Sequence, residues 1–337
     1  MGMKINRRTA FGLGTAAVAT AALANPAQAE EAAEDVSPAT PDLACSQVRR
    51  VYERAAAKAG GTWWSYISVA GADGTPVAAV NTNSDTVIEA WSVNKVPVAM
   101  AVLDKVDRGL LRLDQQIQVP ADIVIPDGDG IIKLDRAYPS AFTLGHVLAL
   151  LLTISDDTCV RLCGSVCPSA ELNQILRDKG FPKTQVDPVA NPNRFFLGKT
   201  TPKEMHDIFQ GLVQGKLLSA TSTDFLFNIL RSQVAFTDGI RRVMSSFDRA
   251  RVATKAGWLH DGRNEAGIMF DKAGKPVLTY SLFADGQGDP DDFGATHPAV
   301  QARSEMGPQF LRAVDRISGA QQARTYAAPS YQPSNGG

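Results

Sequence analysis

The sequence predicts an α+β fold, in which strands from both ends of the chain form one five-stranded antiparallel sheet flanked by helices, and a central helical block forms a second lobe. Strand-like segments lie near both ends of the globular region, and helical periodicity fills the residues between them. The chain of 337 residues is 44% hydrophobic and 20% charged, which is typical of a globular protein with a buried core. We expect the active site in the cleft between the lobes.

The first 29 residues have the pattern of an export signal. Basic residues at positions 4, 7 and 8 precede an apolar segment, 10–24, and Ala27-Gln28-Ala29 offers a cleavage site of small residues. The pair Arg7-Arg8 favours a twin-arginine signal, with a general secretory signal as the alternative. Either signal predicts a secreted or periplasmic protein. The apolar segment is shorter than the ~20 residues that span a bilayer, so we expect no stable membrane insertion.

An acidic, proline-containing linker is expected at 30–41, before a single catalytic domain at 42–318. The sheet lobe takes 42–90 and 250–318. It begins with an amphipathic helix, and a Gly-Ala-Asp-Gly turn joins the next two strands into a hairpin. Three more strands and a closing helix end the domain. The expected bounds are 43–59 (helix), 65–70, 76–80, 251–256, 266–271 and 277–283 (strands) and 299–317 (helix).

The helical lobe takes residues 91–249. Its helices are recognised by apolar periodicity and by glycines at their ends, and they are expected at 92–108, 143–152, 169–179, 202–214 and 223–232. The segment 181–201 is rich in proline and asparagine, and its length makes it a candidate functional loop. The polar tail 319–337 is predicted to be disordered.

Four cysteines allow disulfides in an exported chain. Cys159, Cys163 and Cys167 recur every four residues and share one helical face, which favours small buried apolar side chains. A disulfide between Cys45 and one of the three is the alternative. Without a histidine partner the spacing gives no metal site, and we expect no cofactor.

A candidate nucleophile lies where an extended segment enters an apolar helix. Ser92 and Lys95 are three residues apart, so their side chains share a helical face. A serine hydroxyl needs a neighbouring base, which a lysine amine can supply. The helix N-terminus offers backbone N–H groups to a developing negative charge. The pair is a weak signal by itself, because Ser-x-x-Lys also occurs by chance.

Two later motifs complete a pattern. Ser155-Asp156-Asp157 follows the apolar helix 143–152, and Lys255-Ala256-Gly257 lies on the first returning strand. The order Ser-x-x-Lys, Ser-Asp-Asn, Lys-Thr-Gly is that of serine β-lactamases and penicillin-binding proteins. From about residue 43 to 317 the chain resembles this superfamily, and it is most similar to class A β-lactamases.

The resemblance implies a role for each motif residue. Ser92 would be acylated, with its own backbone N–H and that of Trp258, just past Gly257, as oxyanion hole. Lys95 would accept or relay the Ser92 proton, and Lys255 would place a second cation nearby that attracts an anionic substrate. The Ser155 hydroxyl would bridge the two lysines and pass a proton to the leaving nitrogen.

The resemblance also marks departures in the loop that supplies the deacylation base. The run from Asp187 to Asn191 (Asp-Pro-Val-Ala-Asn) is similar to the class A run Glu-Pro-x-x-Asn. Asp187 would be the general base for the hydrolytic water, and Asn191 would help to hold it. Because aspartate is one methylene shorter than glutamate, a misplacement of about 1 Å could cost ~10²-fold in rate. A simple Asp-Pro turn without a catalytic role is the alternative.

Two further departures concern substrate binding. Asp157 replaces the amide of Ser-Asp-Asn, and an ionised carboxylate there only accepts hydrogen bonds and repels an anionic ligand. Ala256 replaces the hydroxyl of Lys-Thr-Gly. Arg263 is the predicted cationic replacement, since guanidinium binds carboxylate in a bidentate way, and Arg241 or Arg242 is a poorer candidate.

The leading prediction is therefore an exported serine hydrolase that opens β-lactam rings. The alternatives are a D,D-peptidase or esterase on the same scaffold, and a β-lactam-binding protein that stays acylated. A net charge of −1 predicts no nucleic-acid partner. The four histidines, at 146, 206, 260 and 297, have no motif context for a Ser-His-Asp triad. We expect a small-molecule substrate, either a β-lactam or a D-Ala-D-Ala-like peptide, and a monomer.

Overall fold

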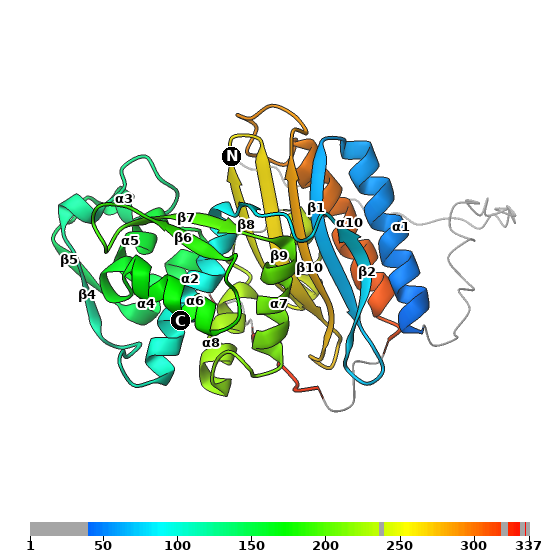
Figure 1. The fold of residues 1–337 in the computed structure, drawn as a ribbon, viewed down its shortest axis with the longest axis horizontal. Helices are drawn as coiled ribbons and strands as arrows, with labels where there is room; N and C mark the ends of the chain where they lie inside the picture. Colours follow the sequence, from blue (N-terminus) through cyan, green and yellow to red (C-terminus); the bar gives the residue numbers. More distant parts are fainter. Residues whose placement is uncertain (1–39, 236–238, 318–322, 331–333, 335–337) are drawn as a thin grey trace, which may run out of the picture. The chain divides into compact units, whose positions relative to one another are not determined.

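Five antiparallel strands in the order β2-β1-β10-β9-β8 form the main sheet, as predicted (Figure 1). The computed structural model describes residues 40–235, 239–317, 323–330 and 334. The predicted export signal and the linker up to residue 39 lie outside the described residues. The strands are β1 (Thr62–Ala70), β2 (Pro76–Thr82), β8 (Val252–Leu259), β9 (Gly262–Phe270) and β10 (Pro276–Asp285).

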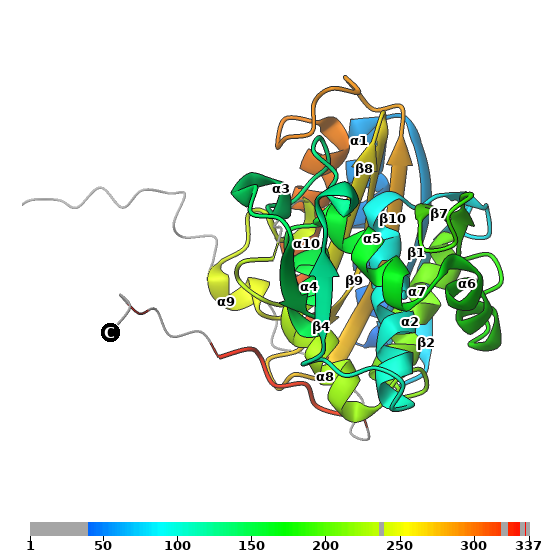
Figure 2. The same cartoon turned by 90° about the vertical axis from the view of Figure 1, so that its left-hand side faces the viewer.

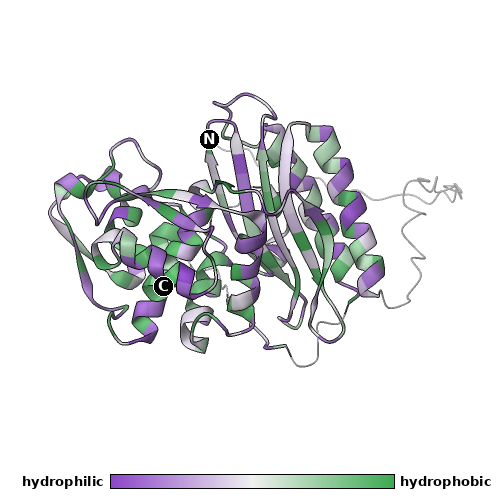
Figure 3. Cartoon of the chain, viewed as in Figure 1, coloured by the Kyte–Doolittle hydropathy of each residue, from purple (hydrophilic) through white to green (hydrophobic). Residues whose placement is uncertain are grey.

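Helices α1 (Pro41–Ala59) and α10 (Pro298–Val314) cover one face of this sheet (Figure 1). Thr40 caps α1 by accepting a hydrogen bond from Leu43 N, and Pro41 suits the first helical position because it has no N–H to satisfy. The buried side chains of α1 recur every three or four residues, and Figure 3 shows the helix as alternating polar and apolar turns. These buried side chains pack against β1 and β2.

The other face carries the helical lobe, which faces the viewer in Figure 2. Helices α7 and α8 pack on β8, β9, β10 and β1, and α2, α4, α5 and α6 pack around one another beyond them. The long helices of this lobe are α2 (Lys95–Asp107), α4 (Leu144–Thr153), α5 (Asp157–Val166), α6 (Ser169–Asp178), α7 (Pro202–Val213) and α8 (Ala220–Leu230). The short elements are β3 (Ile88–Glu89), η2 (Trp91–Asn94), β4 (Gln116–Val119), η3 (Ala121–Ile123), α3 (Ile132–Asp135), β5 (Ser140–Thr143), η4 (Gly239–Arg241) and α9 (Ser246–Arg249).

The long loop predicted at 181–201 is instead largely a hairpin. Strands β6 (Gln185–Pro188) and β7 (Phe195–Thr200) pair with each other, and β7 also pairs with β3. Prolines and asparagines mask these short strands in the sequence, because such residues are typical of turns. Pairing with a two-residue strand more than a hundred positions earlier is a tertiary contact that local periodicity does not reveal.

All four cysteines are free and buried, so the prediction of small apolar side chains is confirmed. Burial raises the pKa of Cys167 to about 12 and that of Cys159 well above its ordinary value. These thiols are therefore inert toward oxidation and metal binding at neutral pH. Among the residues that the structure describes, no helix is both long and apolar enough to cross a membrane.

The prediction of a disordered tail is wrong for residues 323–330. Tyr326 is buried against the rings of Phe227 on α8 and Phe270 on β9. Its hydroxyl donates to Val213 O at 3.0 Å, and Arg231 donates to the carbonyl oxygens of Tyr326 and Ala327, both at 3.0 Å. The polar composition of the tail gave no sign that the ring of Tyr326 packs into the core.

We expect Tyr326→Ala to lower the free energy of unfolding by about 2–3 kcal/mol, because it removes a buried aromatic ring and its hydrogen bond. Urea denaturation followed by tryptophan fluorescence measures this change. The matched control is Thr325→Ala at the exposed neighbouring position, which should change stability by less than ~0.5 kcal/mol. Equal stability of both variants would show that the docked tail contributes nothing.

Candidate active site

Ser92 lies in the 3₁₀ segment η2, not in the first turn of an α-helix as predicted, and α2 begins at Lys95. Two asparagines fix this segment: Asn94 donates to the carbonyls of Leu197 and Lys199 on β7, and Asn264 on β9 donates to Glu89 O. Ser92 is therefore held between the sheet and the β6–β7 hairpin.

Strand β8 passes directly over η2 at Gly257. A Cβ at this position would lie 2.6 Å from Ser92 N and 2.7 Å from Val93 N, so a residue with any side chain would push the strand away. Gly257 thus brings the backbone of Trp258 beside Ser92. This is the position that the predicted oxyanion hole requires.

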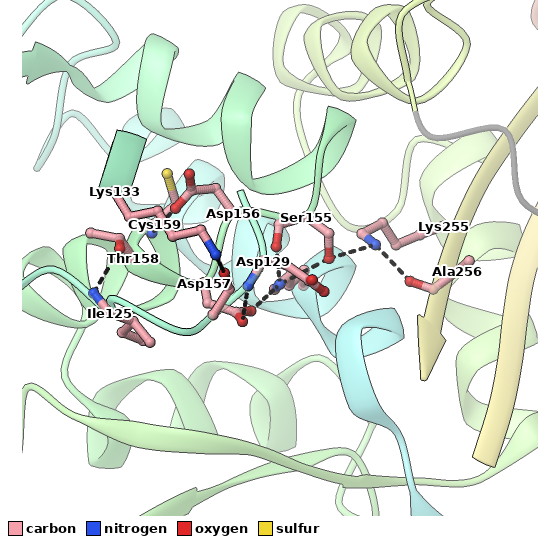
Figure 4. Close-up of polar contacts among 12 residues, drawn as sticks. Ile125, Asp129, Lys133, Ser155, Asp156, Asp157, Thr158, Cys159, Lys255 and Ala256 are labelled. Carbon is pink, nitrogen blue, oxygen red and sulfur yellow. Dashed lines mark hydrogen bonds and ion pairs between the residues drawn. The ribbon is translucent and has the colours of Figure 1, made fainter. Parts of the chain in front are cut away.

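Ser155 connects the two lysines, as predicted. Its hydroxyl accepts hydrogen bonds from Lys95 Nζ at 2.9 Å and from Lys255 Nζ at 3.2 Å (Figure 4). Lys95 Nζ also donates to Ser155 O at 2.5 Å, and Lys255 Nζ to Ala256 O at 2.6 Å. Ser155 has a positive φ of 59°, so its backbone is strained to place carbonyl and hydroxyl toward one amine. All three side chains are buried.

Asp157 completes this network by forming an ion pair with Lys95. Its Oδ1 lies 2.7 Å from Lys95 Nζ, and its Oδ2 accepts from Asp129 N at 2.9 Å (Figure 4). The carboxylate is thus turned toward the amine and a backbone N–H. Among the described residues, no hydrogen bond joins Lys95 to the Ser92 hydroxyl. The amine of Lys95 instead donates to Ser155 and Asp157.

The loop before α3, which belongs to none of the three motifs, is part of the site. Asp156 caps α5 and accepts from the backbone N–H groups of Ile131 and Ile132. A Cβ at Gly130 would lie 2.1 Å from the Asp156 carboxylate, and one at Gly128 would lie 2.8 Å from that of Asp157. The signal that could have identified the loop is its pair of glycines, which let the backbone approach two carboxylates.

Asp129 enters the site through this loop. Burial and the nearby Asp157 carboxylate raise the pKa of Asp129, while Lys95 and Lys255 partly oppose them. The site therefore holds more carboxylates than the three motifs predict. Among the described residues, no group of three or more His, Cys, Asp or Glu side chains could hold a metal ion.

A cavity of about 1220 Å³ opens above Ser92, which is 9% exposed. Asp157, Asp187 and Trp258 line it, as their predicted positions require. Apolar side chains from three separate elements form much of its rim, and they are Val189, Phe196, Leu259 and Phe293.

Two predicted substrate-site residues do not lie there. Arg263 is buried, and its guanidinium donates to the carbonyls of His260, Gly262, Pro290 and Asp292 and lies over the ring of Phe293. Its predicted role in binding a substrate carboxylate is wrong, because backbone acceptors already engage it. Arg241 is likewise buried on carbonyl oxygens. Asn191 lies exposed in the β6–β7 turn, where its Oδ1 accepts from Asn193 N, and it does not line the cavity.

Comparison with known proteins identifies the family and the fold. The model of the β-lactamase enzyme family matches residues 46–313. The chain belongs to this family. A β-lactamase structure from Sphaerobacter thermophilus aligns with a TM-score of 0.67 and 23% identity, covering 81% of this chain and 98% of that one. The fold prediction is confirmed.

Two further likenesses are to PBP-A and to a curated β-lactamase. A mutant of PBP-A solved as an acyl-enzyme complex with penicillin G aligns with a TM-score of 0.59 and 21% identity, covering 82% of this chain and 98% of that one. The curated β-lactamase VEB-1 of Pseudomonas aeruginosa is 26% identical over 159 residues, which are 44% of this chain and 52% of that protein. The match thus spans about half the length of that relative.

A hydroxyl–imidazole–carboxylate chain, separate from the Ser92 site, lies on the sheet. Ser68 Oγ is 2.7 Å from His206 Nε2, and His206 Nδ1 is 2.9 Å from Asp207. Sequence spacing gave no indication of it, because β1 and α7 meet only in the fold. Ser68 is 1% exposed within β1, so no substrate carbonyl can reach its hydroxyl. This chain joins α7 to the sheet instead.

Because of His206, we expect stability to fall as the pH drops below about 6.5. Burial lowers the pKa of His206, so the unfolded chain binds more protons than the folded one in that range. Urea unfolding at pH 7.5 and 5.5 measures the loss, and His206→Gln should reduce it. A residual loss is expected from His297, whose pKa burial also lowers. An unchanged pH dependence in His206→Gln would contradict this assignment.

We expect Asp157→Asn to speed acylation of Ser92 by roughly tenfold, because it weakens the charge-assisted bond that engages the Lys95 amine and so makes this amine more available as a base. Burst kinetics with a chromogenic cephalosporin measure the rate. Asp157→Glu retains the charge and should give no acceleration. Slower acylation in Asp157→Asn at unchanged thermal stability would show that the ion pair assists the reaction.

Proposed function

We propose that the protein is an exported serine hydrolase that opens β-lactam rings through an acyl-enzyme on Ser92. The observation that carries this proposal is the hydrogen-bond network of Lys95, Ser155 and Lys255, which the ion pair of Lys95 with Asp157 joins to the lining of the Ser92 cavity. A network of two amines and one hydroxyl can move a proton between a nucleophile and a leaving group.

The reaction follows from these positions. Ser92 Oγ attacks the lactam carbonyl carbon while its proton passes to the Lys95–Ser155 network. The backbone N–H groups of Ser92 and Trp258 stabilise the negative oxygen of the tetrahedral intermediate. The C–N bond then breaks, Ser155 delivers the proton to the leaving nitrogen, and Ser92 retains the acyl group as an ester. Water hydrolyses this ester, with Asp187 as the proposed general base.

A binding protein that stays acylated is the second candidate, and one observation favours it. The residue predicted to position the hydrolytic water with Asp187, Asn191, lies in an exposed turn away from the cavity. If no other group orders that water, deacylation is slow and the adduct persists.

Incubation of the mature protein with a chromogenic cephalosporin, followed by intact mass, separates the candidates. Turnover without a lasting adduct supports the β-lactamase. A stable adduct mapped to Ser92, without turnover, supports the binding protein. Hydrolysis of a small ester or a D-Ala-D-Ala peptide, with no reaction of the cephalosporin, would replace both with a D,D-peptidase or esterase.

Export is part of the same proposal and depends on residues 1–29. Fusion of this segment to a reporter should place the reporter outside the cytoplasm. Replacement of Arg7-Arg8 by two lysines should stop a twin-arginine signal, whereas a general secretory signal would tolerate the change. Cytoplasmic retention of the unaltered fusion would contradict export.

A further inference from the structure

The walls of the Ser92 cavity carry a charge distribution that disfavours an anionic substrate. Of the described residues that line the cavity, five carry carboxylates and two carry guanidinium groups. The carboxylates are those of Glu89, Asp127, Asp129, Asp157 and Asp187. One of the two guanidinium groups, that of Arg161, donates to the carbonyls of Ile123 and Val124.

The two lysines of the Ser155 network do not reverse this balance. Lys95 and Asp157 form an ion pair at 2.7 Å, which leaves four carboxylates against the two guanidinium groups and Lys255, whose Nζ donates to Ser155 Oγ and Ala256 O. The wall beyond Gly257 has no hydroxyl at Ala256, and Arg263 is turned to backbone carbonyls. A carboxylate placed along β8 would meet apolar groups and one cation, that of Lys255, whose Nζ already donates to Ser155 Oγ and Ala256 O.

Exposed apolar side chains line the cavity on both its sheet side and its hairpin side. Leu259 and Phe293 on the sheet side are each 45% exposed, and Phe196 on the hairpin side is 73% exposed. Exposed apolar side chains that gather on one cavity mark a binding surface for an apolar group.

We propose that the cavity selects uncharged substrates with an aromatic or other large apolar group over carboxylate-bearing β-lactams. This inference rests on the proposed acylation of Ser92 and specifies its substrate class. The substrate carbonyl lies over Ser92, and the apolar group of the substrate packs against Phe196, Leu259 and Phe293. The substrate brings no carboxylate of its own near Asp129 and Asp157. Transfer of the acyl group to Ser92 Oγ and of the proton to the leaving atom is unchanged.

A matched pair of ligands tests this proposal. Penicillin G and its methyl ester differ by one charge and share the phenylacetyl group. We expect the ester to acylate Ser92 about tenfold faster, after each rate is divided by the ligand's own rate of alkaline hydrolysis. The preference should shrink as salt is added, because ions screen the repulsion. Stopped-flow absorbance and intact mass measure both rates.

Two phenylalanine variants test the apolar wall. Phe196→Ala should slow the penicillin G ester by roughly tenfold, because the lost contact is worth about 1.4 kcal/mol. It should not slow the methyl ester of penicillanic acid, which has no aromatic side chain. The control is Phe247→Ala on α9, which is 65% exposed and does not line the cavity. Neither substitution removes a buried side chain.

The outcomes separate this inference from the proposed function. An equal or faster reaction of the free acid overturns the inference and leaves acylation of Ser92 intact. An equal loss in Phe196→Ala for both esters overturns the role of the aromatic wall. A lack of any Ser92 adduct with either form of penicillin G overturns the proposed function itself.

Discussion

Ser92→Ala is expected to abolish acylation and to lower turnover of any substrate by at least ~10⁴-fold. In serine hydrolases, loss of the nucleophile alone costs about as much as loss of the whole catalytic group. Here Ser92 is the hydroxyl that faces the cavity, beside the backbone that Gly257 brings close. Intact mass after incubation with penicillin G methyl ester should show an adduct on the unaltered protein and none on the variant.

The control for this prediction is Ser68, the hydroxyl of the chain that Ser68, His206 and Asp207 form. Ser68→Ala removes the partner of His206 on β1, which is not part of the cavity lining, and should keep both adduct and turnover. Both variants must show the same circular dichroism as the parent. Full activity in Ser92→Ala would prove the mechanism wrong, whatever the substrate.

Asp187→Asn is expected to leave acylation unchanged and to slow loss of the acyl group by ~10²–10⁴-fold, which is the usual contribution of a general base. Asp187 lies on β6 and lines the cavity, so its carboxylate can reach a water near the ester. The neutral amide has nearly the same shape but accepts no proton. Pulse labelling of Ser92, removal of free ligand and mass measurement over time give the rate.

Asn191→Asp is the matched control. It keeps the oxygen that accepts from Asn193 N in the turn, and it lies outside the cavity lining, so the decay rate should stay within twofold of the parent. A slower decay in this variant would support the predicted role of Asn191 in holding the hydrolytic water, although Asn191 lies outside the cavity lining. An equal decay in Asp187→Asn and the parent would exclude Asp187 as the base.

The sheet and most helices were predictable because their signals are local. The Gly-Ala-Asp-Gly turn between β1 and β2, the apolar run of α4 and the glycines that end α2 and α6 each fix an element within a few residues. The three motifs were predictable for a related reason. Each is a short run whose chemistry needs particular residue types, so their order along the chain could be recognised without knowledge of the fold.

Four features escaped prediction, and each depends on a distant partner. Arg263 looked available for a substrate, but the carbonyls of Pro290 and Asp292 bind its guanidinium. Tyr326 looked like part of a polar tail, but the rings of Phe227 and Phe270 bury it. The remaining two are the β6–β7 hairpin and the Asp129 loop at the active site.

The sequence by itself determined the family resemblance, the α+β order of elements and the identity of the chemical groups around Ser92. The tertiary structure alone decided which of those groups touch: Lys95 is held by Asp157, and the cavity wall is acidic and apolar rather than cationic. The physical reason is one of range. Local periodicity and motif chemistry act over a few residues, whereas a side chain's charge partner and exposure are set by segments that only folding brings together.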